Sequence, residues 1–234
     1  MASKIYTELL ALENPEKVGL YTQFFRANKG DICYGDRFLA AKIPEIRKLV
    51  KKYYKQLDFK DLSEFLNSPY NEIRFFGQQV ICQKYQKQDF LKAYNLLALN
   101  IKSINHWNLV DTVASTFADF AIKTQDLSDL RAFAVSTNFW ARRIAIVACI
   151  SFVKTSTFEE FVFWVFDQNK TYKHEYIQKA LGWALRKMGK SSEQNLINYL
   201  KENWQILSPI TKSYATEHLR KTLNIKILFC SQDS

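Results

Sequence analysis

The sequence predicts an all-α protein in which antiparallel helix pairs stack along the chain. Apolar residues recur at three- and four-residue steps through almost its whole length, as they do on the buried face of a helix. Only 6 glycines and 4 prolines occur in 234 residues, which leaves little material for the turns of a sheet protein. Because 47% of the residues are hydrophobic, the chain can bury a continuous core.

The helices are expected in pairs. Ile46, Leu49 and Val50 form one apolar face near the start, and Asp, Ser or Asn precedes many of the later helices, as an N-cap does. Repeated pairs at intervals of ~30–40 residues are typical of HEAT and armadillo solenoids. No interdomain linker interrupts the series, so we expect a single domain over 1–234. The predicted pairs are 58–67 with 70–86, 89–102 with 105–123, 127–136 with 138–154, 157–167 with 172–189, and 192–203 with 211–223.

The net charge of +10 favours a polyanionic partner, with DNA or RNA as the first candidates. A generally basic protein with no such partner has the same composition, and charge alone does not distinguish the two. No segment reads as a basic amphipathic anchor or as an apolar span, so we expect no membrane partner. The first residues, MASKIYTELL, lack the apolar stretch of a signal peptide, which favours the cytoplasm.

Cysteine and histidine give no support for a metal site. Cys33, Cys82, Cys149 and Cys230 lie far apart, and no Cys/His cluster is present. We therefore expect reduced cysteines, mostly in the core, and neither a metal nor a cofactor. The three histidines have no partner at ligand spacing and are predicted at the surface or at helix ends: His106, His174 and His218.

Candidate reactive residues fall on three consecutive second helices. Trp107 and Asp111 are four residues apart and therefore share a helix face. Arg143 lies on the next second helix, and Trp183 on the one after. In a curved solenoid the second helices line the concave surface, so these residues predict an aromatic floor with one acid and a cation.

Each of these residues also has an ordinary structural interpretation. A Trp on an apolar helix is usually a core residue, and we assign Trp140 and Trp164 to the core. A lone Asp usually faces solvent or caps a helix, and an Arg pair usually forms a solvated face. Evidence beyond spacing is therefore needed before Trp107 and Asp111 are interpreted as functional.

The order of the motifs along the chain supplies this further evidence. In that order the sequence resembles the AlkD-like DNA alkylation repair family, whose members are HEAT-like-repeat DNA glycosylases. The resemblance covers most of the chain and implies a curved right-handed superhelix. Two departures are Ala40–Ala41, in place of a Gly-plus-aliphatic pair, and Asn108, in place of an Asp. The matching motifs are GDRFLAAKIPEIRKLVKKY (35–53), NEIRFFGQQV (71–80), INHWNLVDT (104–112), FWARRIAIVA (139–148) and YIQKALGWALRKMGK (176–190).

The resemblance also implies roles for individual residues. Trp107 and Asp111 match the family's catalytic Trp and Asp, and Arg143 matches its active-site arginine. Trp183 matches a second aromatic wall, and Tyr34 is our choice for the aromatic residue that borders the site from the N-terminal side. The implied substrate is double-stranded DNA containing alkylated bases, bound without flipping the base into a pocket.

The chemistry fits these residue types. A purine alkylated on a ring nitrogen is cationic and leaves as a neutral base, so no general acid is needed. Ionised Asp111 could stabilise the oxocarbenium-like sugar and orient water. Trp107 and Trp183 could present their π faces to the cationic nucleotide. Arg143 could hold a phosphate with two parallel hydrogen bonds or keep Asp111 ionised.

Basic residues on the same helices are candidates for contacts with the DNA backbone. Such contacts add affinity without base specificity. The candidates are Arg47, Lys48, Arg142, Lys179, Arg186 and Lys187.

Three functions remain open at this stage. The first is an enzyme that excises alkylated purines, and the second is a non-catalytic module that binds damaged or branched DNA. The third, a protein-binding HEAT scaffold, is less favoured because of the basic charge and the ordered motifs. We expect no obligate protein partner and a monomer.

Overall fold

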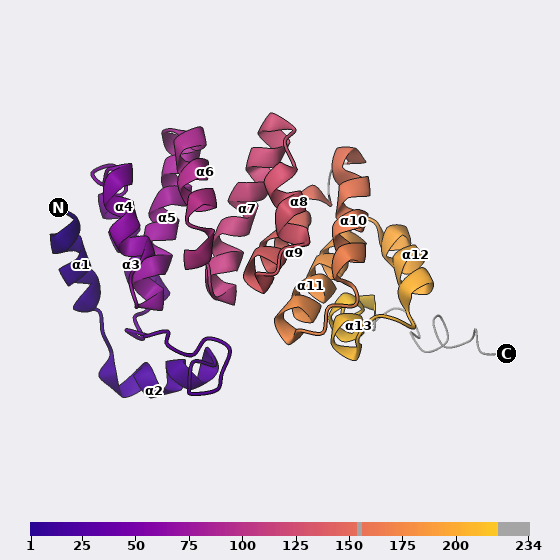
Figure 1. Ribbon diagram of the computed structural model, residues 1–234, viewed down its shortest axis with the longest axis horizontal. Helices are drawn as coiled ribbons and strands as arrows, with labels where there is room; N and C mark the ends of the chain where they lie inside the picture. The colour runs from indigo at the N-terminus through magenta and orange to yellow at the C-terminus, as the bar shows by residue number, and fades with distance from the viewer. Residues whose placement is uncertain (154–155, 220–234) are drawn as a thin grey trace. The chain divides into compact units, whose positions relative to one another are not determined.

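The computed structural model describes residues 1–153 and 156–219, and α-helices dominate these ranges (Figure 1). No strand occurs in them, and one isolated bridge pairs Arg37 with Tyr70. The all-α prediction is therefore confirmed. The helices are α1 (Ala2–Leu10), α2 (Pro15–Phe24), α3 (Ile43–Tyr53), α4 (Phe59–Leu66), α5 (Asn71–Lys87), α6 (Phe90–Leu99), α7 (Trp107–Thr124), α8 (Ser128–Ala134), α9 (Phe139–Phe152), α10 (Glu159–Asn169), α11 (Glu175–Ser191), α12 (Glu193–Asn203) and α13 (Pro209–Ala215), with 3₁₀ turns at Ile101–Ser103 and Ser156–Phe158.

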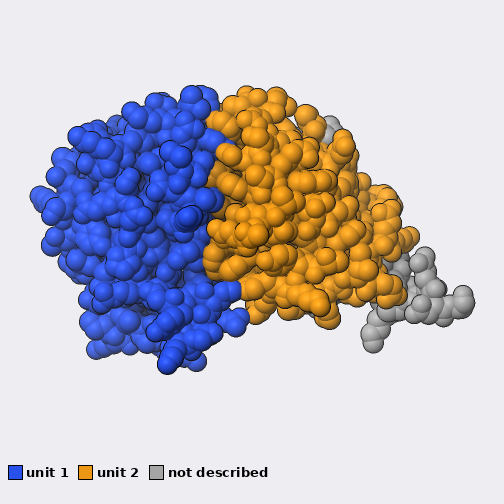
Figure 2. All heavy atoms as spheres, in the orientation of Figure 1, with its two compact units in different colours: residues 1–116 blue, residues 117–234 orange. Residues whose placement is uncertain are grey.

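The chain divides into two compact units (Figure 2). Unit 1 covers residues 1–116 and contains α1 to α6 with the first turns of α7. In it α4 and α6 each pack against α5, and α3 packs on the same helix. Phe65 and Phe76 are fully buried and their rings are in contact where α4 meets α5.

Helix α2 differs from the rest of unit 1 because none of its residues is fully buried. Pro15 starts it, since proline at the first helical position loses no backbone hydrogen bond. Its apolar residues Leu20 and Phe24 are 65% and 68% exposed. The helix therefore presents apolar side chains to solvent, at a place where the site described below begins.

Unit 2 begins at residue 117, and its described residues end at 219. Helix α9 packs against α8, α10 and α11, while α11 also packs against α12 and α13. Phe152 on α9 and Phe166 on α10 are fully buried. Helices α9 and α11 are therefore the central elements of this unit.

The predicted helix pairs are confirmed within a few residues at most ends. The clearest difference is at the last helix, which ends at Ala215 and is followed by turns up to residue 219. The remaining predicted residues of that helix, 220–223, and Cys230 lie outside the described residues. The single domain and the curvature stay predictions.

Two side-chain placements correct the sequence analysis. His106 stands at a helix start as expected, but its side chain is fully buried and not at the surface. Trp140 is buried as predicted, whereas Trp164 is half-buried and receives the Arg131 guanidinium on its ring face. Within the described residues, no helix is both long enough and apolar enough to cross a bilayer.

Candidate functional site

The first turns of α7 carry the two residues that the sequence analysis ranked highest. Trp107 opens the helix, and Asp111 follows one turn later on the same face. Both side chains are half-buried, so each is held by the protein and still reaches solvent.

Trp107 belongs to an aromatic ledge, which we define as Phe24, Phe25 and Trp107. The Trp107 ring stacks on Phe25, with 5.6 Å between centroids and 23° between planes. Phe24 meets the Trp107 ring edge-on at 6.2 Å. Phe25 stacks in turn on buried Phe38 at 5.0 Å, so the ledge rests on the core of unit 1.

The sequence analysis missed the two phenylalanines of the ledge. Tyr34, which it chose instead, lies in the loop after α2, where it is 66% exposed. No ring contact joins Tyr34 to Trp107 in the part of the chain that the structure describes. The adjacent Phe24–Phe25 pair at the end of an otherwise weakly amphipathic helix was the available signal.

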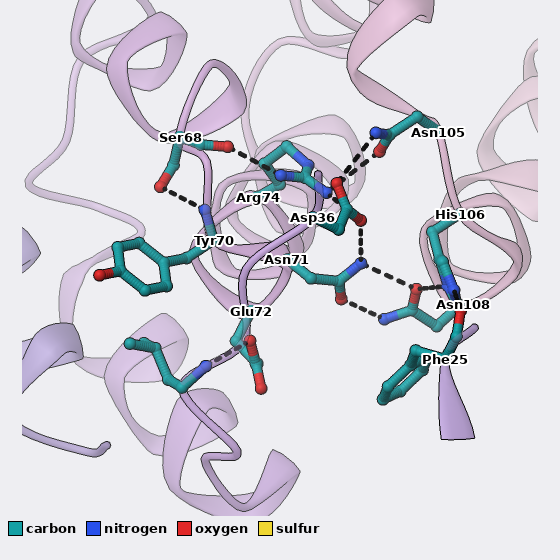
Figure 3. Close-up of polar contacts among 11 residues, drawn as sticks. Phe25, Asp36, Ser68, Tyr70, Asn71, Glu72, Arg74, Asn105, His106 and Asn108 are labelled. Atoms are coloured by element: carbon teal, nitrogen blue, oxygen red, sulfur yellow. Dashed lines mark hydrogen bonds and ion pairs between the residues drawn. The ribbon is translucent and has the colours of Figure 1, made fainter. Parts of the chain in front are cut away.

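His106 ties the ledge to α7 (Figure 3). Its Nε2 lies 3.1 Å from the Phe25 carbonyl oxygen, and its Nδ1 lies 2.7 Å from the Asn108 amide oxygen. Both partner atoms are oxygen acceptors, so the neutral imidazole donates to one of them through its single N–H. Burial lowers the pKa of His106, although both hydrogen bonds oppose that shift. One buried imidazole therefore fixes the residue before Trp107 to the residue on which Trp107 stacks.

A polar network continues from Asn108 to the start of α5. Asn108 Nδ2 donates to Asn71 Oδ1 at 2.7 Å, and Asn71 Nδ2 lies 3.4 Å from an Asp36 oxygen. Asp36 also forms a 2.7 Å ion pair with Arg74, and both side chains are more than nine-tenths buried. Asn105 joins the same pair from just before α7 (Figure 3). The network locks α5, α7 and the loop after α2 together below the aromatic ledge.

The other two high-ranking residues lie in unit 2. Arg143, on α9, is buried, and its Nη1 donates to the Tyr176 carbonyl oxygen at 2.7 Å, in the first turn of α11. Trp183 lies on α11 and is half-buried. Trp107 and Asp111 thus belong to unit 1, and Arg143 and Trp183 to unit 2. That all four converge on one substrate stays a prediction.

Arg142 has a structural partner set of its own. Its guanidinium donates to the Ala134 and Val135 carbonyls at 3.0 Å each and to that of Ser136. It therefore satisfies carbonyl groups at the C-terminal end of α8, which helical hydrogen bonds leave without partners.

The remaining basic candidates differ in how strongly the protein holds them. Arg47 and Lys48 are exposed on α3, and Lys187 is half-buried on α11. Lys179 forms an ion pair with Glu175, and Arg186 forms one with Glu217. The first three present their charge more openly than the last two.

Nothing in the described part of the chain forms a metal centre, because no three His, Cys, Asp or Glu residues are grouped there. Cys33, Cys82 and Cys149 are free thiols. Burial raises the pKa of Cys33 to about 12 and that of Cys82 to about 11, so neither is a ready thiolate.

A family model described as "DNA alkylation repair enzyme" matches residues 5–219. The chain belongs to this family. Membership confirms the resemblance inferred from the ordered motifs. No curated protein matches the chain.

Solved structures show the same fold as this DNA alkylation repair family member. A predicted DNA alkylation repair enzyme from Enterococcus faecalis superposes with a TM-score of 0.72 at 20% identity, covering 90% of this chain and 98% of that one. AlkD2 from Streptococcus mutans gives 0.57 at 17%, covering 86% and 98%. The protein smu.31 from Streptococcus mutans UA159 gives 0.57 at 20%, covering 75% and 92%. At these identities the likeness concerns the fold.

Proposed function

We propose that this family member is a DNA glycosylase that excises positively charged alkylated purines from duplex DNA. The observation that carries the proposal is the placement of Asp111 one turn after Trp107 on α7, with both side chains half-buried and Trp107 seated on the aromatic ledge. A held carboxylate beside a π surface suits a reaction in which positive charge moves from base to sugar.

In the proposed reaction the bond between C1′ of the sugar and the purine nitrogen breaks, and its electron pair goes to the base. The cationic base thereby leaves as a neutral molecule. Ionised Asp111 stabilises the positive sugar and orients a water molecule, whose oxygen bonds to C1′ while its proton passes to the carboxylate. The products are a free alkylated purine and an abasic sugar. No flipping of the damaged base is required.

Arg143 and Trp183 keep in this proposal the roles that the sequence analysis predicts for them. Arg143 holds a backbone phosphate, and its hydrogen bond to the Tyr176 carbonyl sets the position of its guanidinium. Trp183 supplies a second aromatic surface. Phe24 takes the bordering position that the sequence analysis gave to Tyr34, because Phe24 contacts Trp107.

Release of 7-methylguanine from methylated duplex DNA tests the proposal. Removing an electrostatic stabiliser of the transition state typically costs about 10²–10³-fold in rate, and we expect this loss for Asp111→Asn. Asp119→Asn is the matched control, because Asp119 lies two turns further along α7 in an exposed ion pair with Lys123. We expect this control to retain the wild-type rate.

A second substrate separates the mechanism from general glycosylase activity. DNA with hypoxanthine, an uncharged base, should release nothing, because no positive charge is present to drive departure. Folded wild-type protein that binds duplex DNA tightly and releases no alkylated base would instead be a non-catalytic DNA-binding module.

A further inference from the structure

A pocket of about 310 Å³ lies inside unit 1 beside the aromatic ledge. Residues of α2, α3, α5 and the start of α7 line it. Ligand pockets usually span about 300–1,000 Å³, so this one suits a single small ring system. The residues that line it are Leu20, Tyr21, Phe24, Phe25, Ile43, Asn71, Glu72, Phe75 and Asn108.

The walls of the pocket are mainly aromatic and aliphatic, and its amide and carboxylate groups come from the starts of α5 and α7. Tyr21, Phe24, Phe25 and Phe75 offer ring surfaces suited to a flat ligand. No Lys or Arg lines the pocket, while Glu72 does. A phosphate would therefore find no cationic partner there and would meet a carboxylate. The lining selects a flat ligand without a phosphate.

Glu72 is the strongest polar feature of this pocket. The residue is only 3% exposed. Within the described residues, one of its two carboxylate oxygens accepts a hydrogen bond and the other does not. Oε2 accepts the Leu39 backbone N–H at 3.0 Å, and Oε1 has no hydrogen-bond partner there. Figure 3 shows the two oxygens turned to different sides. A buried acceptor without a donor costs free energy, which a ligand N–H would recover.

Asn108 adds a complementary donor at the end of the same pocket. One of its two amide N–H groups donates to Asn71, and the other has no acceptor in the part of the chain that the structure describes. An acceptor at Glu72 and a donor at Asn108 match the edge of a purine, which carries N–H groups and ring nitrogens.

We propose that this pocket binds the free alkylated purine base that the proposed function releases. The proposal rests on that function for the identity of the base. The base leaves beside Trp107 as a neutral, flat molecule without a phosphate, and the pocket opens next to Phe24 of the same ledge. Stacking against the phenylalanines and donation to Glu72 hold it there.

Calorimetric titration with free 3-methyladenine tests the pocket without any catalysis. Leu20→Trp places a large ring at the mouth without disturbing the core, since Leu20 is 65% exposed. Loss of 1.4 kcal/mol is a tenfold weakening, and we expect about tenfold or more for this variant. Gln23→Trp adds the same ring to an exposed part of α2 that does not line the pocket, and should bind like wild type.

Three further measurements sharpen the test. Glu72→Gln should weaken binding, and adenosine monophosphate should not bind, because no cation faces its phosphate. Asp111→Asn saturated with methylated duplex should still bind the free base. Blockage in that last measurement would mean that the attached base occupies or covers the pocket, and would overturn the assignment to the released base.

The two proposals fail separately. Base release from DNA with no saturable binding of 3-methyladenine would overturn the pocket and leave the proposed function intact. Equal binding by wild type and Leu20→Trp would overturn the pocket as well. Binding that Leu20→Trp abolishes would support the pocket even in a protein that releases no base.

Discussion

At the residue scale, the candidate site rests on buried polar side chains that hydrogen-bond or pair with one another. His106 links the Phe25 carbonyl to Asn108, and Asp36 neutralises Arg74 beneath them. Sequence spacing placed Trp107 and Asp111 on one helix face, and the ordered motifs of the family resemblance made them candidates. It could not identify His106 as buried, because its partner carbonyl is 81 residues away. Contacts across such separations are fixed by tertiary packing and leave no periodic pattern.

The lowered pKa of His106 predicts a pH dependence of stability. The neutral ring is favoured in the folded state, whereas the unfolded chain titrates near 6.5. Stability is therefore fully present above about pH 6.5 and is lost as the pH falls through the folded pKa. We expect the stability advantage of wild type over His106→Gln to shrink between pH 7.5 and 5.5 in urea denaturation. Other titrating groups, common to both proteins, cancel in this difference. A constant difference would contradict the prediction.

The Asp36–Arg74 pair predicts a large effect of a small substitution. Asp36→Asn leaves the Arg74 guanidinium buried without a countercharge, and breaking such pairs typically costs about 3–5 kcal/mol. Urea denaturation measures the change. Lys52→Gln is the control, because it removes an ion pair with Glu8 in which the lysine is 57% exposed. Solvent screens that pair, and we expect a much smaller change. Similar losses in both variants would argue against a stabilising role for the buried network.

At the element scale, the sequence predicts strongly periodic helices better than their connections. Helices α5, α9 and α11 were expected from apolar spacing and were found. The loop that enters α3 was not foreseen in detail, because Ala40 adopts a positive φ of 54°. The Leu39 N–H beside it is held by Glu72 from α5. The place of α2 beside the candidate site was also missed, since none of its residues is fully buried and its Leu20 and Phe24 side chains are exposed.

Two helical glycines, one packed between α11 and α13 and one open to solvent in α2, predict opposite outcomes for an alanine substitution. A Cβ at Gly182 would lie 2.5 Å from the Tyr214 Cβ and 2.8 Å from the Thr211 carbonyl oxygen. Gly182→Ala should therefore force the helices apart and cost about 1–3 kcal/mol, as overpacking does. Gly19, inside α2, has nothing within 4 Å of its Cβ position. Gly19→Ala should stabilise by about 0.5–1 kcal/mol through helix propensity. Thermal denaturation of both variants measures the difference, and a neutral Gly182→Ala would refute the close packing.

At the scale of the whole molecule, charge and fold have to be considered together. A net charge of +10 does not by itself distinguish a DNA-binding protein from a basic one. Family membership adds the expectation of DNA, but it does not say which cations bind phosphate. The structure separates the candidates by how far their charge is already used. Arg142 serves the end of α8, and Lys179 and Arg186 have carboxylate partners.

This separation predicts different salt dependences of duplex binding. Each phosphate contact adds about 0.9 to the slope of log affinity against log salt. Lys48→Ala and Lys187→Ala should each lower the slope by about that amount, because DNA binding releases fewer counterions when a phosphate contact is removed. Lys179→Ala should lower it less, since Glu175 already neutralises that charge.

Fluorescence anisotropy with an undamaged duplex at several salt concentrations measures these slopes. Lys123→Ala is the matched control, because Lys123 pairs with Asp119 and is not a predicted contact. An equal fall in slope for Lys48→Ala and Lys123→Ala would mean that net charge, rather than placed contacts, governs binding. Unchanged slopes for both Lys48→Ala and Lys187→Ala would show that these lysines on α3 and α11 do not contact phosphate. The predicted DNA-backbone contacts of the two helices would then be wrong.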